Sequence, residues 1–297
     1  MATIIANSGT IADTKKAIAM TSPEAEKKQL NIQNRIRFAI CSELRRNIII
    51  ALRAREKGVS ELRKILGVSS TTAIHALRDL EKNKIIFEDG KRNYGLTKVG
   101  EVIALKISDF VDAIDVLQKH EEFWLTHDLS AIPPHLMEKI GWLRDSTLVA
   151  DTSTDIFKSH TTSLQVLENA NEVKGIYPIF HLEYMTMIEE LVRRKGIDVE
   201  LIVTNEVLNS IVGMVETEEA FKIFLQEPNF TLFAMEEDTK VCLTLTDSVF
   251  YLGLFTDSGT YDYNNALISD AKEALSWGRE LHEYHRQLSS NVVDLWI

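Results

Sequence analysis

The stretch VSELRKILGVSSTTAIHALRDLEKNKIIFEDGKRNYGLT, residues 59–97, decides the fold of the N-terminal part of the chain. Its first half predicts two short amphipathic helices, separated at Gly67 by a tight turn. Asp89-Gly90 then lies between two short apolar runs, a pattern that predicts a β-hairpin. Two helices joined by a turn are common, but a hairpin directly after the second helix is more specific. This order of elements predicts a winged helix-turn-helix.

The segments on either side extend the motif. A helix is expected before it, from apolar residues that recur at near-helical spacing at Ile40, Leu44, Ile48 and Leu52. Ser60 is expected to cap the first helix of the motif, and Thr97 to begin a long helix that continues to about Lys119. The predicted DNA-binding domain covers residues 30–100. A weakly structured arm is expected before it at residues 1–29, and a connecting or dimer helix after it at residues 101–120.

Charge is unevenly distributed along the chain. The 297 residues carry a formal net charge of −11, which by itself disfavours binding to nucleic acid. Residues 41–100, however, hold 13 Lys and Arg against 7 Asp and Glu, a net charge of +6. The rest of the chain keeps 20 of the 33 basic and 37 of the 44 acidic residues, a net charge of −17. Neutralising phosphates requires such a local basic surface, although a solvated helical domain would give the same pattern.

One face of the second helix of the motif is polar, and a helix of this kind offers its N-terminal residues to base edges in the major groove. His75 and Arg78 are long enough to reach a base, and arginine can pair with guanine through two hydrogen bonds. Lys91 and Arg92 near the hairpin tip could hold phosphates, whereas Tyr94 could contact phosphate or pack in the hairpin. A solvated polar face is the alternative. The predicted DNA-binding residues are Ser70, Thr71, Thr72, His75, Arg78, Lys91, Arg92 and Tyr94.

The long helix after the hairpin predicts a partner for the chain. Its apolar stripe could contact a second copy or pack against the second domain, and dimer contact is favoured because two-fold dimers place two recognition helices one turn of DNA apart. The stripe comprises Val99, Val102, Ile103, Leu105, Ile107, Val111, Ile114 and Leu117. Double-stranded DNA and a second copy of the chain are therefore the expected partners.

Composition excludes several other classes of protein. Hydrophobic residues make up 45% and charged residues 26% of the chain, which is typical of a globular protein. No apolar run approaches ~20 residues, so a membrane span is not expected, and the N-terminus lacks the pattern of a secretory signal. Cys41 and Cys242 stand beside apolar residues and are expected to be buried free thiols in a reducing compartment. We expect a cytoplasmic protein of two domains.

Beyond Glu121, strand-like and helix-like runs alternate, which predicts an α/β domain over residues 121–297 with a mainly parallel sheet covered on both faces. The expected strands are Val173–Phe180, Asp198–Thr204, Phe230–Met235, Val241–Thr246, Val249–Phe255 and Ala266–Ser269. The expected helices are His181–Lys195, Asn205–Gln226 in two pieces, and Ala271–Leu288. An apolar stripe expected in the core or in a dimer contact lies on the last helix at Trp277, Leu281, Tyr284 and Leu288.

Four unusual strings carry a family resemblance: FWLTHDLSAIPPHLMEKIG at Phe123–Gly141, KGIDVELIVTNEVL at Lys195–Leu208, SVFYLGLFTDSGTYD at Ser248–Asp262 and ALSWGRELHEYHR at Ala274–Arg286. From about residue 30 to residue 288, the chain resembles archaeal winged helix-turn-helix transcriptional regulators that carry a Fil-type, or methanogenesis-regulatory-protein, middle domain. The resemblance implies a regulator of methane-producing archaea with an N-terminal DNA-binding domain and a C-terminal sensing domain. The arm before residue 30 lies outside the pattern.

The middle domain of that family is similar in arrangement to half of a phospholipase-D-like sheet, which raises an enzymatic alternative. Phosphodiesterases of that type need a nucleophilic His and a Lys two positions later, and none of the eight His residues has a Lys there. The sequence also lacks a GxSxG motif and a Gly-rich phosphate loop. We therefore expect a non-catalytic binding sheet, with no catalytic residue and no cofactor. His120 and His127 could hold a metal, but packing between the domains is favoured, so no metal site is expected.

The carboxyl ends of the strands are where an open α/β sheet binds a small molecule. The candidate effector residues are Phe180, His181 and Tyr184 after one strand, and Thr204, Asn205 and Glu206 after the next. Polar groups at such places also act as helix caps, a role that Thr204-Asn205 would fit. The sequence thus predicts a DNA-binding transcriptional regulator whose C-terminal domain senses a small molecule or a partner. The alternative is a protein-interaction adaptor whose winged helix binds protein.

Overall fold

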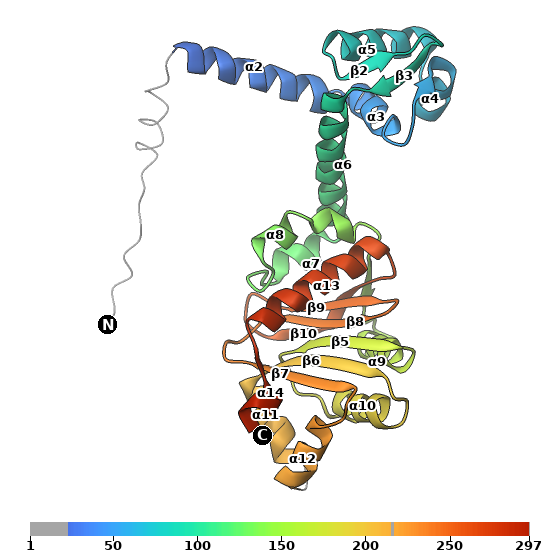
Figure 1. Cartoon of the computed structure of the whole chain (residues 1–297). Helices are drawn as coiled ribbons and strands as arrows, with labels where there is room; N and C mark the ends of the chain where they lie inside the picture. Colours follow the sequence, from blue (N-terminus) through green and yellow to red (C-terminus); the bar gives the residue numbers. More distant parts are fainter. Residues whose placement is uncertain (1–22, 215–216, 297) are drawn as a thin grey trace. The chain divides into compact units, whose positions relative to one another are not determined.

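A computed structural model describes residues 23–214 and 217–296 of the chain. The chain divides into two compact units between Ser108 and Asp109, inside one long helix (Figure 1). Of the arm predicted at residues 1–29, residues 1–22 lie outside the described part. Residues 23–29 begin the first described helix, so the predicted boundary at residue 30 falls within a helix.

The first unit is a winged helix-turn-helix, as predicted. Its elements are α2 (Pro23–Ile40), α3 (Glu43–Ala51), β1 (Lys57–Gly58), α4 (Val59–Leu66), α5 (Ser70–Lys82), β2 (Ile86–Glu88), β3 (Asn93–Leu96) and the first half of α6 (Lys98–Lys119). The strands form an antiparallel sheet in the order β1-β3-β2. Its core includes Ile48, Leu62 and Leu77, which are fully buried. The single helix expected around Ile40 is interrupted, because Ser42 caps α3 as a new helix.

Local signals set where these helices begin and end. Ser69 caps α5 and Thr97 caps α6, and each hydroxyl oxygen accepts a hydrogen bond from the backbone N–H three residues on, at 3.1 Å and 3.0 Å. Gly67 ends α4 in the left-handed conformation, with φ at 65°. The expected cap at Ser60 is wrong, because α4 already begins at Val59.

The second unit is a three-layer α/β domain around one eight-stranded sheet (Figure 1). Its helices are the end of α6, α7 (Glu121–Thr126), α8 (Pro134–Met137), the 3-10 helix η1 (Ile140–Leu143), α9 (Lys158–Glu168), α10 (Leu182–Arg193), α11 (Asn205–Met214), α12 (Glu218–Leu225), α13 (Lys272–Gln287) and α14 (Val292–Trp296). Its strands are β4 (Thr147–Ala150), β5 (Glu172–Tyr177), β6 (Asp198–Thr204), β7 (Phe230–Met235), β8 (Val241–Thr246), β9 (Phe250–Phe255), β10 (Tyr261–Ser269) and β11 (Ser290–Asn291). The strand order is β11-β7-β6-β5-β8-β9-β10-β4.

The sheet is mixed, so the prediction of a mainly parallel sheet is wrong. Only β5, β6 and β7 run parallel to one another, and the other neighbouring pairs are antiparallel. Helical crossovers through α10 and through α11 and α12 connect the parallel strands, whereas β8 and β9 follow each other through a short turn. Every residue of β8 and β9 is buried. Their apolar strings therefore have the pattern of parallel strands, although their pairing is antiparallel.

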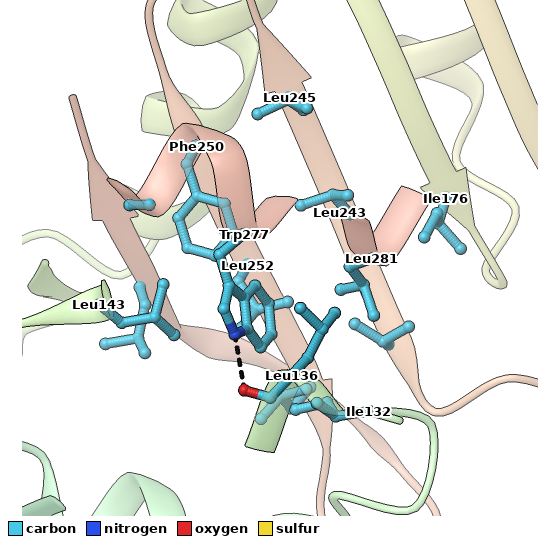
Figure 2. Close-up of a cluster of buried hydrophobic side chains, with 14 of the residues drawn as sticks. Ile132, Leu136, Leu143, Ile176, Leu243, Leu245, Phe250, Leu252, Trp277 and Leu281 are labelled. Atoms are coloured by element: carbon cyan, nitrogen blue, oxygen red, sulfur yellow. Dashed lines mark hydrogen bonds between the residues drawn. The ribbon is translucent and has the colours of Figure 1, made fainter. Parts of the chain in front are cut away.

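Helices cover both faces of this sheet. One core lies under α7, α8, η1 and α13 and contains Trp277, which is fully buried and donates its indole N–H to the carbonyl oxygen of Leu136 at 3.0 Å (Figure 2). The other core lies under α9 to α12 and α14. The predicted stripe on the last helix divides, because Trp277 and Leu281 are buried in the core while Leu288 is exposed.

Two expectations from composition meet different outcomes. Cys242 is buried as predicted, but Cys41 is exposed in the break between α2 and α3, so the expectation of a buried thiol is wrong there. Among the helices that the structure describes, none has the length and apolar character needed to span a membrane.

Candidate nucleic-acid interface and sensing site

The exposed face of α5 carries five of the predicted DNA-binding residues. These are Ser70, Thr71, Thr72, His75 and Arg78, and all five are exposed. The opposite face is buried at Ala73, Ala76, Leu77 and Leu80. Since Thr71, His75 and Arg78 follow at spacings of four and three, they share one side of the helix. The Thr72 hydroxyl lies 2.8 Å from that of Ser69, so it also belongs to the helix cap.

Charge on this face is positive along its centre. Arg78 and Lys82 continue the row that starts with Thr71, and neither forms a salt bridge with a described acidic residue. The carboxylate of the neighbouring Asp79 pairs with Arg45 and not with these cations, since it lies 3.6 Å from the guanidinium of Arg45. The cations of the face are therefore available to an external anion.

The wing is the hairpin of β2 and β3, and its tip is held by one carboxylate. Asp89 accepts hydrogen bonds from the backbone N–H groups of Asn93 at 2.7 Å and Lys91 at 2.8 Å, and from the side-chain amide of Asn93 at 3.1 Å. The amides of Asn93, followed by Lys91, lower the pKa of this carboxyl. Lys91 and Arg92 are exposed at the tip, and Arg92 has a positive φ of 65°. The structure thus presents two cations on an ordered turn.

Tyr94 is buried, unlike the other predicted DNA-binding residues. Its side chain is buried, with 7% of its surface exposed, and burial raises the pKa of its hydroxyl. The reason is its place in β3, the central strand of the small sheet, between β1 and β2. The packing role considered for this residue in the sequence is the one that the structure supports.

The long helix α6 exposes much of its apolar stripe. The exposed members are Val99, Val102, Leu105, Ile114 and Leu117. Phe110, which the sequence analysis did not include, is also exposed, at 56% of its side-chain surface. Ile107 is buried, and Ile103 and Val111 are half-buried. The stripe is therefore split between side chains that pack within the chain and side chains that face away from it.

Three of the candidate effector residues follow β5. Phe180 lines a cavity of about 460 Å³ between α10, α11 and α12, whose walls are largely apolar. Tyr184 stacks on Tyr177 with ring centroids 5.9 Å apart, and its hydroxyl is hydrogen-bonded to that of Ser163. The rings of His181 and Tyr184 are 5.2 Å apart. The end of β5 thus brings together aromatic and polar groups.

The other three candidates follow β6 and do not join that group. Thr204 acts as a helix cap, because its hydroxyl accepts a hydrogen bond from the backbone N–H of Val207 at 3.2 Å. Asn205 and Glu206 are exposed in the first turn of α11. The structure therefore gives Thr204 the capping role that the sequence offered as the alternative.

A cluster that the sequence analysis missed lies beside His181. His160 of α9, His181 and Glu183 place potential ligand atoms within 4.8 Å of one another. His160 Nε2 lies 2.6 Å from the Glu183 carboxylate. No local spacing could have shown this cluster, because α9 and α10 are joined through β5 and meet only in the fold.

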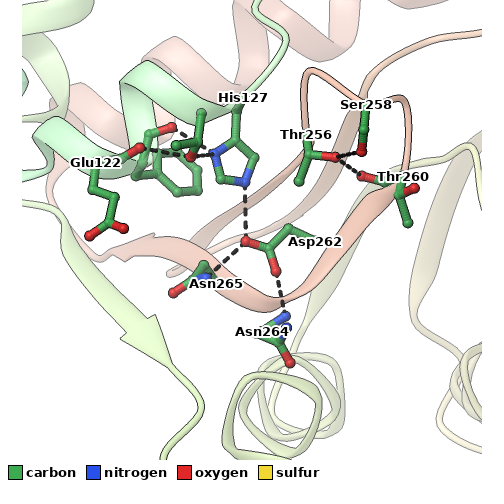
Figure 3. Close-up of polar contacts among 10 residues, drawn as sticks. Glu122, His127, Thr256, Ser258, Thr260, Asp262, Asn264 and Asn265 are labelled. Atoms are coloured by element: carbon green, nitrogen blue, oxygen red, sulfur yellow. Dashed lines mark hydrogen bonds and ion pairs between the residues drawn. The ribbon is translucent and has the colours of Figure 1, made fainter.

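His120 and His127 are held by separate partners. His120 Nε2 lies 3.2 Å from the carbonyl oxygen of Ser146. His127 Nδ1 donates to the carbonyl oxygen of Phe123 at 2.6 Å, and its Nε2 lies 3.2 Å from Asp262 (Figure 3). Phe123 and Trp124 are buried in the core of the α/β domain. The expected interdomain packing is therefore corrected: this segment packs within its own domain.

Comparison with known protein families identifies both parts of the chain. Residues 33–115 match the family described as methanogenesis regulatory protein FilR1, N-terminal domain, and residues 156–288 match its middle domain. The chain belongs to this family of regulators. The matches agree with the resemblance seen in the sequence, and the string at Phe123–Gly141 lies between them.

One curated relative extends the match between the two domains. The methanogenesis regulatory protein FilR1 of Methanothrix harundinacea (strain 6Ac) is 31% identical over 260 residues, which are 87% of this chain. The chain spans 58% of the length of that relative.

Solved structures give weaker likenesses. TrmBL2, an archaeal chromatin protein, has a TM-score of 0.39 at 18% identity, covering 82% of this chain and 92% of that chain. Nuc from Salmonella typhimurium, a phospholipase D family member, has a TM-score of 0.35 at 12% identity, covering 49% and 97%. At these TM-scores, neither likeness carries an argument about function.

Proposed function

We propose that this family member is a cytoplasmic, DNA-binding transcriptional regulator that recognises a promoter site with α5 and its wing. The main support for the proposal is that a polar, exposed face of α5 is followed in the chain by a hairpin whose ordered tip carries two cations. Thr71, His75 and Arg78 share the exposed side of α5, and Lys91 and Arg92 stand on the hairpin that follows it. In winged-helix proteins of this layout, base contacts come from the helix and phosphate contacts from the cations around it.

We further propose that the chain binds DNA as a homodimer through α6. Large apolar side chains such as Val102 and Phe110 are 61% and 56% exposed on this helix. A helix that exposes several large apolar side chains favours contact with a second apolar surface, because removing apolar area from water lowers the free energy. A dimer also gives two recognition helices, which increases affinity over that of one small module.

The α/β domain is proposed to sense a small molecule or partner at the carboxyl end of β5. Support comes from the grouping of His181 and Tyr184 there, and from the cavity beside Phe180. No catalytic step is assigned to this domain, because no His in the sequence is followed by a Lys two positions later.

Selection from a random pool of duplexes tests the recognition face. The wild-type chain should enrich a recurring sequence, whereas His75→Ala with Arg78→Ala should lose that preference at a cost of about 1–3 kcal/mol per lost base contact. The matched control is Lys91→Ala with Arg92→Ala, which should lower affinity but keep the same preferred sequence. Retained preference in the α5 variant would refute the assigned role of α5. A wild-type chain that binds no DNA would favour the protein-interaction adaptor.

A further inference from the structure

Three potential metal ligands meet after the carboxyl end of β5. His160 lies in α9, His181 directly precedes α10, and Glu183 lies in the first turn of α10. One ligand atom of each lies within 4.8 Å of the others. Two imidazoles and a carboxylate suit divalent transition metals, whereas Mg²⁺ and Ca²⁺ prefer oxygen ligands alone. We propose that these three residues bind a divalent transition metal ion of the Zn²⁺ type.

The ligand atoms must shift modestly to surround an ion. His160 Nε2 and the Glu183 carboxylate oxygen are 2.6 Å apart, and the two imidazole centroids are 4.6 Å apart. Ligand atoms at the usual zinc distances in a tetrahedral site lie about 3.3 Å from each other. His160 Nε2 and the Glu183 oxygen must therefore separate by less than about 1 Å, whereas ligand atoms of the cluster that are farther apart, up to 4.8 Å, must approach one another. The Glu183 carboxylate has room to move because its side chain is 62% exposed.

His181 supplies an independent observation. Its Nδ1 atom is buried and has no hydrogen-bond partner among the residues that the structure describes. Buried polar atoms are nearly always paired, so this one calls for a partner that the protein itself does not provide.

The surroundings of His160 also fit a ligand role. The hydroxyl of Tyr184 lies 3.5 Å from His160 Nδ1, the nitrogen that does not face Glu183. In metal sites, the second ring nitrogen of a His ligand is commonly held in this way, which fixes the orientation of the ring. Tyr184 is in turn hydrogen-bonded to Ser163 and stacked on Tyr177. A metal ion bound here would link α9 to α10, and the contacts of Tyr184 would hold the His160 ring in place.

Three protein ligands would leave at least one position for water or a small molecule. Structural zinc sites usually have four protein ligands, whereas sites with three protein ligands hold water or a bound molecule in the fourth position. The inferred site is therefore of the open kind, which can bind a further small ligand on the metal. The inferred metal site rests on the proposed sensing role of the carboxyl end of β5, and it identifies a divalent transition metal ion as the sensed ligand.

Titration of the metal-free, full-length chain with Co²⁺, followed by displacement with Zn²⁺, tests the inference. We expect one Co²⁺ per chain, with visible absorption bands of a nitrogen–oxygen site and no thiolate charge-transfer bands. His160→Ala, His181→Ala and Glu183→Gln should each weaken Zn²⁺ binding by at least about tenfold. The matched control is His135→Ala, because His135 is an exposed residue beside Glu280 in the same domain, and it should leave Zn²⁺ binding unchanged.

Absence of bound metal, thiolate bands, or wild-type affinity in His160→Ala would overturn the inference. Circular dichroism checks that each variant is folded. If a His variant unfolds, the Zn²⁺ affinity of Glu183→Gln decides whether the site exists, because the Glu183 side chain is exposed and can be changed without loss of packing. Wild-type affinity in this variant would then overturn the inference. The titration contains no DNA, so its failure would leave the proposed DNA binding intact, and a failure of DNA binding would leave the metal result standing.

Discussion

Replacing Lys91 and Arg92 at the wing tip with alanine should weaken DNA binding and flatten its dependence on salt. Both side chains are exposed and lie outside the core of the domain. The turn itself should survive, because Asp89 holds it through the backbone amides of Lys91 and Asn93. Alanine at position 92 keeps the left-handed φ of 65° without adding strain beyond that of arginine. The variant therefore removes two charges and little else.

The expected magnitude follows from counterion release. Each phosphate neutralised on duplex DNA contributes about −0.9 to the slope of log affinity against log salt. Loss of both side chains should make the slope shallower by about 1.8 per bound chain. Between about 50 and 200 mM salt, the gap between wild type and variant should therefore shrink by about twelvefold.

Fluorescence anisotropy with a labelled duplex at several salt concentrations measures this slope. The matched control is Lys174→Ala with Arg194→Ala, which removes the same charge from the α/β domain, where both residues pair with surface carboxylates. We expect the control slope to equal that of the wild type. An unchanged slope in the wing variant, or an equal change in the control, would refute a phosphate-contacting wing.

Two further predictions concern α6 and a buried histidine. Phe110→Asp with Ile114→Asp on the exposed stripe should turn a dimer into a monomer in light scattering at micromolar concentration; a wild-type chain that is already monomeric would contradict the dimer. Burial lowers the pKa of His282 to about 4 in the folded chain, from about 6.5 in the unfolded chain. Between these values the unfolded chain binds more protons, so the free energy of unfolding should decrease as the pH falls from about 6.5 to about 4. The shift from about 6.5 to about 4 corresponds to a loss of at most about 3 kcal/mol. The Glu200 carboxylate, 3.5 Å from His282 Nδ1, favours the charged ring and should make the loss smaller. His282→Asn should reduce this dependence in urea titrations, and an unaltered pH dependence would show that His282 is not its source.

The winged helix could be predicted from sequence because each of its boundaries has a local cause. Gly67 adopts the left-handed conformation that ends α4, and Thr97 caps α6. Asp89 organises the hairpin tip with its own carboxylate. Such signals act within a few residues, so they are visible in the sequence. Tyr94 differs because its burial depends on β1, which pairs with β3 from the far side of the motif.

The α/β domain was less predictable because its decisive contacts are distant in the chain. The strands β8 and β9 are buried on both faces, so their composition does not reveal their direction. The cluster of His160, His181 and Glu183 depends on the packing of α9 against α10, which no spacing rule encodes. For Thr204 the sequence allowed both an effector contact and a helix cap, and the structure shows the cap.

Equilibrium binding of the wild-type chain to the DNA upstream of its own gene, compared with a random duplex of equal length, tests the central claim most directly. The measurement should be made at about 50 and 200 mM salt. We predict tighter binding to the upstream DNA at both concentrations, and a fall in affinity for both duplexes as salt rises. Equal affinity for the two duplexes, or affinity that does not fall with salt, would contradict a DNA-binding role for the winged helix.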